Sequence, residues 1–465
     1  MFAFDHSLKS LNIDNFNTIN VQNFSHIFQE CTLINGINVS NFNTINCYDM
    51  SSMFEGCSSI NELDTSGFNT KNVINMSNMF FGCSLLTSLK IENFETNNVK
   101  NMSGMFGGCS GLRYINVSLF ITEKVEDLSK MFQYCISFNE IDFSNFDTSN
   151  VIDMSSMFES CHNLYSLNIS KFNTQKVLDM SNMFKYCYSL DSLNTTNFKT
   201  NEVRNLSGLF DSCKRLDKID VSNFNTNNVE DMSYLFRECN LVRTLEISKF
   251  NTSKVKNMCN MFRRCTLLQN FDVSNFDTSN VEDMSFMFMN VTYITSLNVS
   301  GFNTKKVKDM TLMFGGCEQL QYLNLTNFDT KNVEYFGQMF EDCLELKDID
   351  LSNFDTSSAK EIEGMFHNCY NIEILDLLKF NTKKIKTMAY LFNSCKALKS
   401  LDLNNFDTSN VEDMSFMFEE CQNLDFLNIG NFNTSNVDKW IICLVIVIKL
   451  DLLIYQNLIL ILFNQ

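Results

Sequence analysis

A period of 26 residues runs through almost the whole chain. Seventeen phenylalanines, from Phe16 to Phe432, follow one another at intervals of 26 residues without an insertion. Such a strict period means that one supersecondary unit is repeated and stacked, because a single unit of this size cannot bury its apolar face without neighbours. The chain of 465 residues is therefore expected to fold as a solenoid, although its length alone would suggest several globular domains.

The repeat combines two kinds of apolar spacing. Counted from the phenylalanine as position 1, it reads F-[N/D]-T-x-x-V-x-x-M-S-x-M-F-x-x-C-x-x-L-x-x-L-[D/N]-[V/I/L]-S-N. Apolar residues at positions 6, 9, 13 and 16 have the spacing of one helix face, and polar residues such as Thr148 and Asn150 can cap the helix start. Positions 22 and 24 alternate as in a short strand. The sequence predicts an α/β fold, a curved solenoid with one short parallel strand and one helix in each 26-residue repeat.

The repeats define the expected domain organisation. One solenoid domain of about 16–17 units covers residues 1–437, and its first unit is truncated because Met1 and Phe2 already fall at positions 12 and 13. No charged segment followed by an apolar stretch begins the chain, so no signal peptide is visible. A chain that starts inside a repeat is interpreted as one whose N-terminus is truncated.

The repeat pattern ends after Val437, and residues 438–465 form an apolar tail with three interpretations. Residues 440–463 have the length of a membrane anchor, although Lys449 and Asp451 would be costly at the centre of a bilayer. The tail could instead pack over the open end of the solenoid. It could also be the translation of a disrupted reading frame, unrelated to the fold.

Composition and cysteine placement argue against several classes of function. A net charge of −18 disfavours nucleic acid as a partner, and a membrane enters only through residues 440–463. Fifteen of the 18 cysteines, from Cys31 to Cys421, occupy position 16, and none forms the close pairs of a zinc site. This column predicts buried thiols, and disulfides between neighbouring units are the alternative. The four histidines lie at different repeat positions, and no catalytic triad or phosphate-binding loop is present. The sequence predicts no enzyme and no cofactor.

The repeat resembles that of a known family. The strand pattern L-x-x-L-x-[V/I/L]-x-x-F resembles the leucine-rich repeat, and the unit from Phe406 to Phe418, with Cys421 and Leu424, resembles the BspA-like leucine-rich-repeat surface proteins over roughly residues 1–437. Phenylalanine stands where leucine-rich repeats usually have a buried asparagine, and asparagine falls one place earlier, as at Asn145. The resemblance implies a cell-surface or extracellular adhesion or binding protein with a protein or host-surface ligand. An intracellular scaffold for protein–protein interaction is the alternative, favoured by the unpaired cysteines.

Candidate site residues are expected on the exposed strand positions 21, 23 and 25, which form the concave face in repeat arrays. Two acidic runs at position 23 place carboxylates about 4.8 Å apart on neighbouring strands, where repulsion could be relieved by Ca²⁺ or a basic partner. A solvated acidic face that keeps the solenoid soluble is the alternative. The first run, a calcium candidate, consists of Asp220, Glu246 and Asp272. The second run, a partner-binding candidate, consists of Asp350, Asp376 and Asp402. Further contact candidates are the exposed apolar residues Tyr114, Tyr322, Ile374, Leu378 and Phe426.

Overall fold

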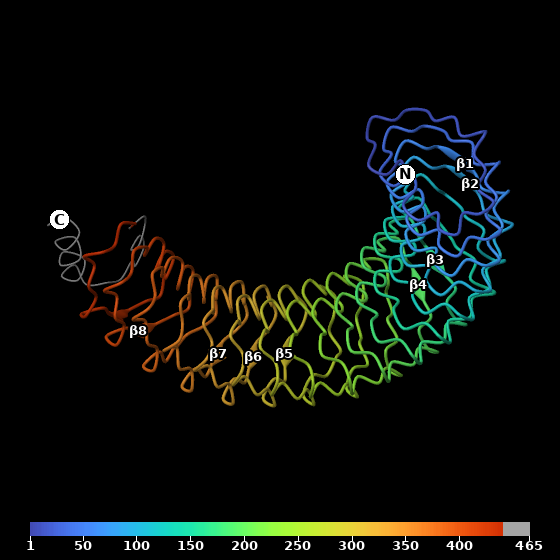
Figure 1. The fold of residues 1–465 in the computed structure, drawn as a ribbon. Coiled ribbons are helices and arrows are strands. Elements are labelled where there is room, and N and C mark those ends of the chain that lie inside the picture. Colours follow the sequence, from blue (N-terminus) through green and yellow to red (C-terminus); the bar gives the residue numbers. More distant parts are fainter. Residues whose placement is uncertain (440–465) are drawn as a thin grey trace. The chain divides into compact units, whose positions relative to one another are not determined.

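The computed structural model describes residues 1–439. The predictions for residues 440–463 fall outside this range, and no helix within it is long and apolar enough to cross a membrane. Contacts divide the chain into two compact units, Met1–Val242 and a second unit that begins at Arg243. Figure 1 shows that each unit consists of successive turns of the same kind lying side by side.

Short parallel strands occur in both units, as the alternation at the end of the repeat predicted. Their pairing joins residues 26 apart, so that Leu63 lies opposite Leu89 and Tyr322 lies opposite Asp348. Two two-stranded sheets, β1-β2 and β3-β4, belong to the first unit, and β5-β6-β7 and β8-β9 belong to the second. The strands are β1 (Glu62–Asp64), β2 (Ser88–Lys90), β3 (Ser166–Leu167), β4 (Ser192–Leu193), β5 (Ser296–Leu297), β6 (Tyr322–Leu323), β7 (Asp348–Ile349), β8 (Ser400–Asp402) and β9 (Phe426–Asn428).

The predicted helix is wrong, because residues 1–439 contain consecutive turns where it was expected and no helix. Backbone N–H groups at positions 9, 11, 13 and 15 donate to carbonyl groups of the next turn instead of bonding within their own segment. In the repeat that begins at Phe146, these bonds are 2.7–3.0 Å long and join Met154 to Asp179, Ser156 to Ser181, Phe158 to Met183 and Ser160 to Lys185. Stacking of turns therefore satisfies the donors that a helix would have used itself.

Backbone handedness explains why the helical spacing was misleading. Every residue of the described chain with positive φ lies at repeat position 11 or 15, for example Ser156 at 56° and Ser160 at 62°. Gly104 and Gly108 occupy the same two positions in an earlier repeat, with φ of 60° and 71°. Two left-handed residues four positions apart interrupt a right-handed helix. The apolar residues at positions 6, 9, 13 and 16 still face inward, but along a chain of tight turns.

The core consists of columns of identical side chains. The ring of Phe158 is fully buried and stacks between Phe132 and Phe184, with ring centroids 6.0 and 5.9 Å apart. At position 3, Thr148 Oγ1 donates to the Asn173 carbonyl oxygen at 3.0 Å and accepts from the Asn173 N–H at 2.7 Å. These columns fix each turn on the next one through both apolar packing and hydrogen bonds.

Asparagine also forms a column, one place before the phenylalanine. Asn145 Nδ2 donates to the carbonyl oxygen of Ser118 in the previous turn at 2.6 Å. Asn41, Asn93 and Asn353 make the same bond across 27 residues. The departure from the usual leucine-rich pattern is thus a different placement of the asparagine, which still bonds to the backbone of its neighbour.

The cysteines of the described chain are free and buried, as predicted from their column at position 16. Cys161 Sγ donates to the carbonyl oxygen of Phe132 in the previous turn at 3.2 Å. Burial raises the pKa of Cys161 well above its ordinary value and raises the pKa of Cys109 to about 12. Since the thiolate is the reactive form, these thiols are structural.

Candidate functional site

The exposed apolar residues predicted on the strand face are exposed in the structure. In the second unit, Tyr322, Ile374 and Phe426 share position 21 and are 58%, 65% and 53% exposed. One turn separates each from the next, because Tyr322 pairs with Asp348 while Ser400 lies between Ile374 and Phe426. Two strand spacings put successive apolar side chains roughly 10 Å apart.

The other two apolar candidates lie differently with respect to this row. Leu378 is 66% exposed and follows Ile374 at position 25 of the same repeat. Tyr114 is exposed in the first unit, where Ser88 and Glu140 occupy position 21 of the two adjacent turns. We call Tyr322, Ile374, Leu378 and Phe426 the apolar row, and Tyr114 is not part of it.

The carboxylates of the second acidic run hold the turn that follows each strand. Asp350 Oδ1 accepts from the Ser352 N–H at 2.9 Å, and the hydrogen bonds from Ser352 lower the Asp350 pKa. Asp376 accepts from the N–H of Leu378 at 3.1 Å, and Asp402 from that of Asn404 at 3.0 Å. Their position on the exposed face also leaves these carboxylates available to a ligand.

The three calcium candidates are divided between the two units. Asp220 belongs to the first unit, whereas Glu246 and Asp272 belong to the second. Asp220 accepts from Ser222, and Asp272 from Ser274, and these hydrogen bonds lower both pKa values. Among residues 1–439, no group of three or more His, Cys, Asp or Glu side chains is arranged to hold a metal ion. Calcium binding by this run stays a prediction.

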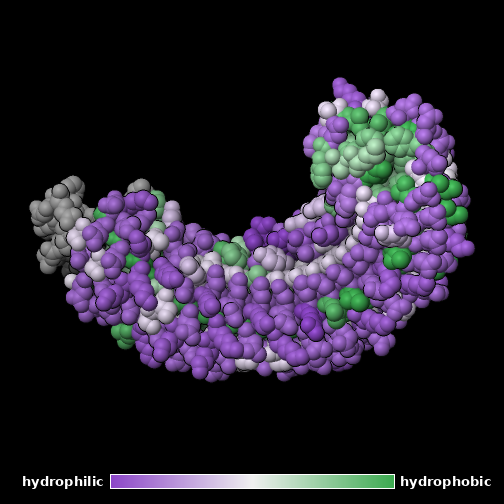
Figure 2. Space-filling view, in the orientation of Figure 1, coloured by the Kyte–Doolittle hydropathy of each residue, from purple (hydrophilic) through white to green (hydrophobic). Residues whose placement is uncertain are grey.

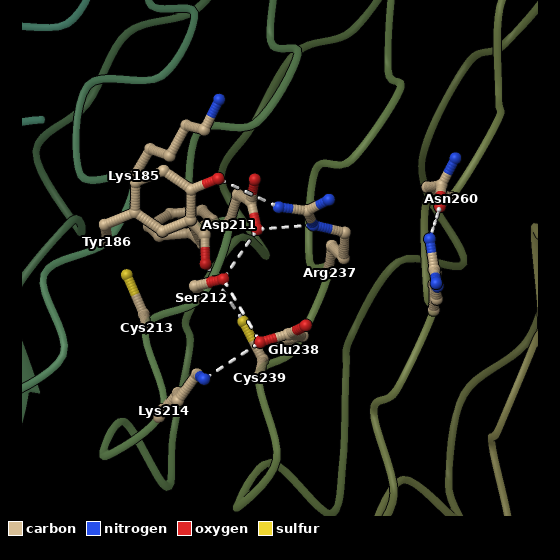
Figure 3. Close-up of polar contacts among 12 residues, drawn as sticks. Lys185, Tyr186, Asp211, Ser212, Cys213, Lys214, Arg237, Glu238, Cys239 and Asn260 are labelled. Atoms are coloured by element: carbon tan, nitrogen blue, oxygen red, sulfur yellow. Dashed lines mark hydrogen bonds and ion pairs between the residues drawn. The ribbon is translucent and has the colours of Figure 1, made fainter. Parts of the chain in front are cut away.

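A buried polar cluster in the first unit escaped the sequence analysis (Figure 3). Asp211 is 1% exposed, and its Oδ1 accepts from Arg237 Nε at 2.8 Å and from Ser212 Oγ at 2.9 Å. Arg237 Nη2 donates to the hydroxyl of Tyr186 at 3.2 Å. Burial raises the pKa of Asp211, although the bond from Arg237 acts in the opposite direction.

This cluster joins three consecutive turns, since Tyr186, Asp211 and Arg237 come from successive repeats. Its arrangement stabilises one register between these turns, because a shift would leave the buried carboxylate without its cation. Repeat positions 14 and 15 vary along the chain and drop out of the consensus. The usable signal was the alternation of charge at position 14, with Lys185, Asp211 and Arg237 in successive repeats.

Comparison with protein families gives matches over both units. Six overlapping segments, residues 1–114, 86–191, 112–219, 204–322, 291–374 and 370–441, match the family described as Mycoplasma protein of unknown function, DUF285. The chain belongs to this family. No protein with a curated function is significantly similar in sequence to this DUF285 protein.

Solved structures similar to the DUF285 chain include three bacterial leucine-rich-repeat proteins. A leucine-rich repeat protein from Bacteroides ovatus has a TM-score of 0.45 and 18% identity over 78% of this chain and 85% of its own. One from Eubacterium ventriosum has a TM-score of 0.38 and 14% identity over 68% and 85%. A leucine rich cell surface protein from Faecalibacterium prausnitzii has a TM-score of 0.27 and 14% identity over 70% and 74%.

Proposed function

We propose that this DUF285 protein is a non-enzymatic binding protein that contacts its ligand through the strand face of the second unit. The apolar row carries the proposal. Single exposed apolar side chains are common on protein surfaces and mean little. Here, however, Tyr322, Ile374 and Phe426 recur at one repeat position in every second turn, and aromatic residues are frequent anchors of interfaces.

The chemistry of the same face defines the ligand class. Between residues 322 and 430, positions 21, 23 and 25 include four aspartates and no lysine or arginine. A ligand with basic and apolar groups is therefore complementary to this face. The spacing of roughly 10 Å matches one turn of an extended polyproline II segment, three residues at about 3.1 Å each, which presents every third side chain on the same face. We infer a basic, extended segment of a protein or host-surface ligand with an apolar side chain at every third residue.

The resemblance of the repeat to BspA-like surface proteins supports a cell-surface or extracellular location for this binding. An intracellular interaction scaffold is the second candidate, favoured by the free cysteines of the described chain, since free thiols are typical of reducing compartments. Burial makes these thiols inert in either compartment. The strand-face contact is the same in both cases.

Selection from a library of nine-residue peptides displayed on phage tests the proposed contact. Peptides selected by the full chain should carry Lys or Arg between apolar residues spaced by three. A triple variant, Tyr322→Ser, Ile374→Ser and Phe426→Ser, should bind the best peptide at least tenfold more weakly. Changing Asp350, Asp376 and Asp402 together to Asn should also weaken binding and reduce its dependence on salt.

The matched control removes three exposed leucines that lie outside the strand face. Leu85, Leu119 and Leu241 occupy repeat positions 18, 26 and 18 in the first unit, so changing them to Ser should alter peptide affinity less than twofold. Equal weakening by the control, or wild-type affinity of the strand-face variant, would show that the ligand binds elsewhere.

A further inference from the structure

A groove on the first unit lies outside the strand face. Its lining residues occupy repeat positions 2, 4, 5 and 7, and it consists of two hollows with volumes of about 650 and 410 Å³. Ile152 and Lys176 line both hollows, which are therefore adjoining. The lining residues run from Lys100 to Glu202, over five consecutive turns, or roughly 19 Å at one strand spacing per turn.

The apolar part of this groove consists of Ile152 and Leu178. They occupy position 7 of adjacent turns, are 41% and 37% exposed, and are joined by a 2.8 Å bond from the Leu178 N–H to the Ile152 carbonyl. The same position in the second unit holds the charged pairs Glu282 with Lys308, Glu334 with Lys360 and Lys386 with Glu412. Since the repeat accepts charged residues at this position, the fold does not require the two aliphatic side chains.

Lysines outnumber carboxylates along the groove by four to two, since Lys100 pairs with Glu126 and Glu202 lines the same hollow as Lys176 and Lys199. Lys124, Lys176 and Lys199 make no ion pair within residues 1–439. The ammonium groups of Lys124 and Lys176 donate to amide oxygens of Asn98 and Asn150 at 2.6 Å, which leaves their charge in place. In a chain with a net charge of −18, this groove is a local attractor for anionic groups.

Figure 2 shows that one face of the molecule is mostly hydrophilic, with hydrophobic residues in separate clusters. The aliphatic pair and the three lysines without an ion pair distinguish the groove from the same columns of the second unit, where position 7 carries ion pairs. Carboxylates are complementary to the rim, and an aliphatic side chain is complementary to Ile152 and Leu178.

We propose that this groove binds an extended acidic segment of a partner protein. One apolar side chain of the segment packs between Ile152 and Leu178, and carboxylates on either side of it contact Lys124, Lys176 and Lys199. About six extended residues span the groove at 3.3 Å each. A sulfated polysaccharide matches the charge but offers no aliphatic side chain to the pair. The binding is separate from that of the strand face and does not depend on it.

A fluorescent heptapeptide, Glu-Asp-Glu-Leu-Glu-Asp-Glu with blocked ends, is the probe, and fluorescence anisotropy with the full chain measures its affinity. Changing Lys124, Lys176 and Lys199 together to Gln should weaken binding at least tenfold at low salt. Leu178→Ser should weaken it about threefold or more. Replacing the central leucine of the probe by serine should reduce the affinity of the wild-type chain by a similar factor.

The control lies at repeat positions 5 and 7 of the second unit. Lys306, Lys308 and Lys360 changed to Gln remove the same charge, and the affinity should change less than twofold. Equal weakening by this control, or no binding of the heptapeptide by the wild type, overturns the proposal. A heparin fragment is tested as a competitor of the heptapeptide. If it displaces the heptapeptide, and Leu178→Ser changes the affinity of neither ligand, the groove binds sulfated polymers instead. A melting temperature equal to that of the wild type confirms that the variants are folded.

Discussion

The threonine at repeat position 3 offers a sharp test of how the turns are held together. Thr148 is 1% exposed, and its hydroxyl makes two hydrogen bonds to the backbone of Asn173 in the next turn, one as donor and one as acceptor. Thr148→Val keeps the shape of the side chain and removes both bonds. Asn173 is then left with an N–H and a carbonyl group that have lost their partner.

The expected loss follows from these two bonds. A typical intramolecular hydrogen bond contributes about 1 kcal/mol net, and leaving a buried polar group unpaired costs about 1–3 kcal/mol. Because the Asn173 backbone is only partly buried, we expect a loss near the lower end, about 2–3 kcal/mol. Thr148→Ser is the control, since it keeps the hydroxyl and loses one methyl group, which costs about 1 kcal/mol.

Hydrogen exchange measured by mass spectrometry detects the change locally. Free energy of 2–3 kcal/mol corresponds to roughly 30- to 150-fold faster exchange of the Asn173 amide in Thr148→Val, since 1.4 kcal/mol is tenfold. Peptides several turns away should exchange as in the wild type, because the backbone bonds between turns join adjacent repeats. If Val protected the Asn173 amide as well as Ser does, the hydroxyl would not hold the turns together and the reasoning would fail.

Three other results are expected from the core, the thiols and the carboxylates. Phe158→Ala should destabilise its region by about 3–5 kcal/mol in urea unfolding, because it removes a buried ring stacked on both sides. Iodoacetamide at pH 8 should leave Cys109, with its pKa of about 12, unlabelled until denaturant is added. The bond from Ser352 lowers the pKa of Asp350 in the folded protein, and protonation of Asp350 at low pH removes this stabilisation. In acid titrations, the wild type should therefore lose stability relative to Asp350→Asn below about pH 4.

The sequence predicted the features that depend on the period and on burial alone. Stacking, parallel strands joined 26 residues apart and the inward direction of Met154 and Phe158 are confirmed. The helix was wrong because spacings of three and four residues also arise in tight turns, here with two left-handed residues four positions apart in each repeat. Glycine recurring at positions 11 and 15, as at Gly104 and Gly108, was the available signal, since glycine inside a helix is unfavourable.

The candidate site was predictable to a smaller extent, because it depends on variable positions and on the contacts between turns. Alternation in a strand identified Tyr322 and Phe426 as exposed. The spacing of Asp350 and Ser352 is also typical of a side chain that bonds to the backbone two residues on, a role that the carboxylate repulsion argument had overlooked. The buried pair of Asp211 with Arg237 needs knowledge of which turns are in contact and how deeply a variable position lies.

In this repeat protein, positions that recur hold the fold together and positions that vary give each stretch of surface its own chemistry. Thr148 and Phe158 do in one turn what their equivalents do in the next, so they carry no information about a ligand. Ile152 stands in a column where the second unit has ion pairs, and Ile374 stands where neighbouring turns have aspartate or serine. Each such exception exposes apolar surface that stacking does not need. The charged residues around them differ in sign, since lysines outnumber carboxylates around Ile152 and aspartates surround Ile374. The two proposed surfaces therefore favour ligands of opposite charge.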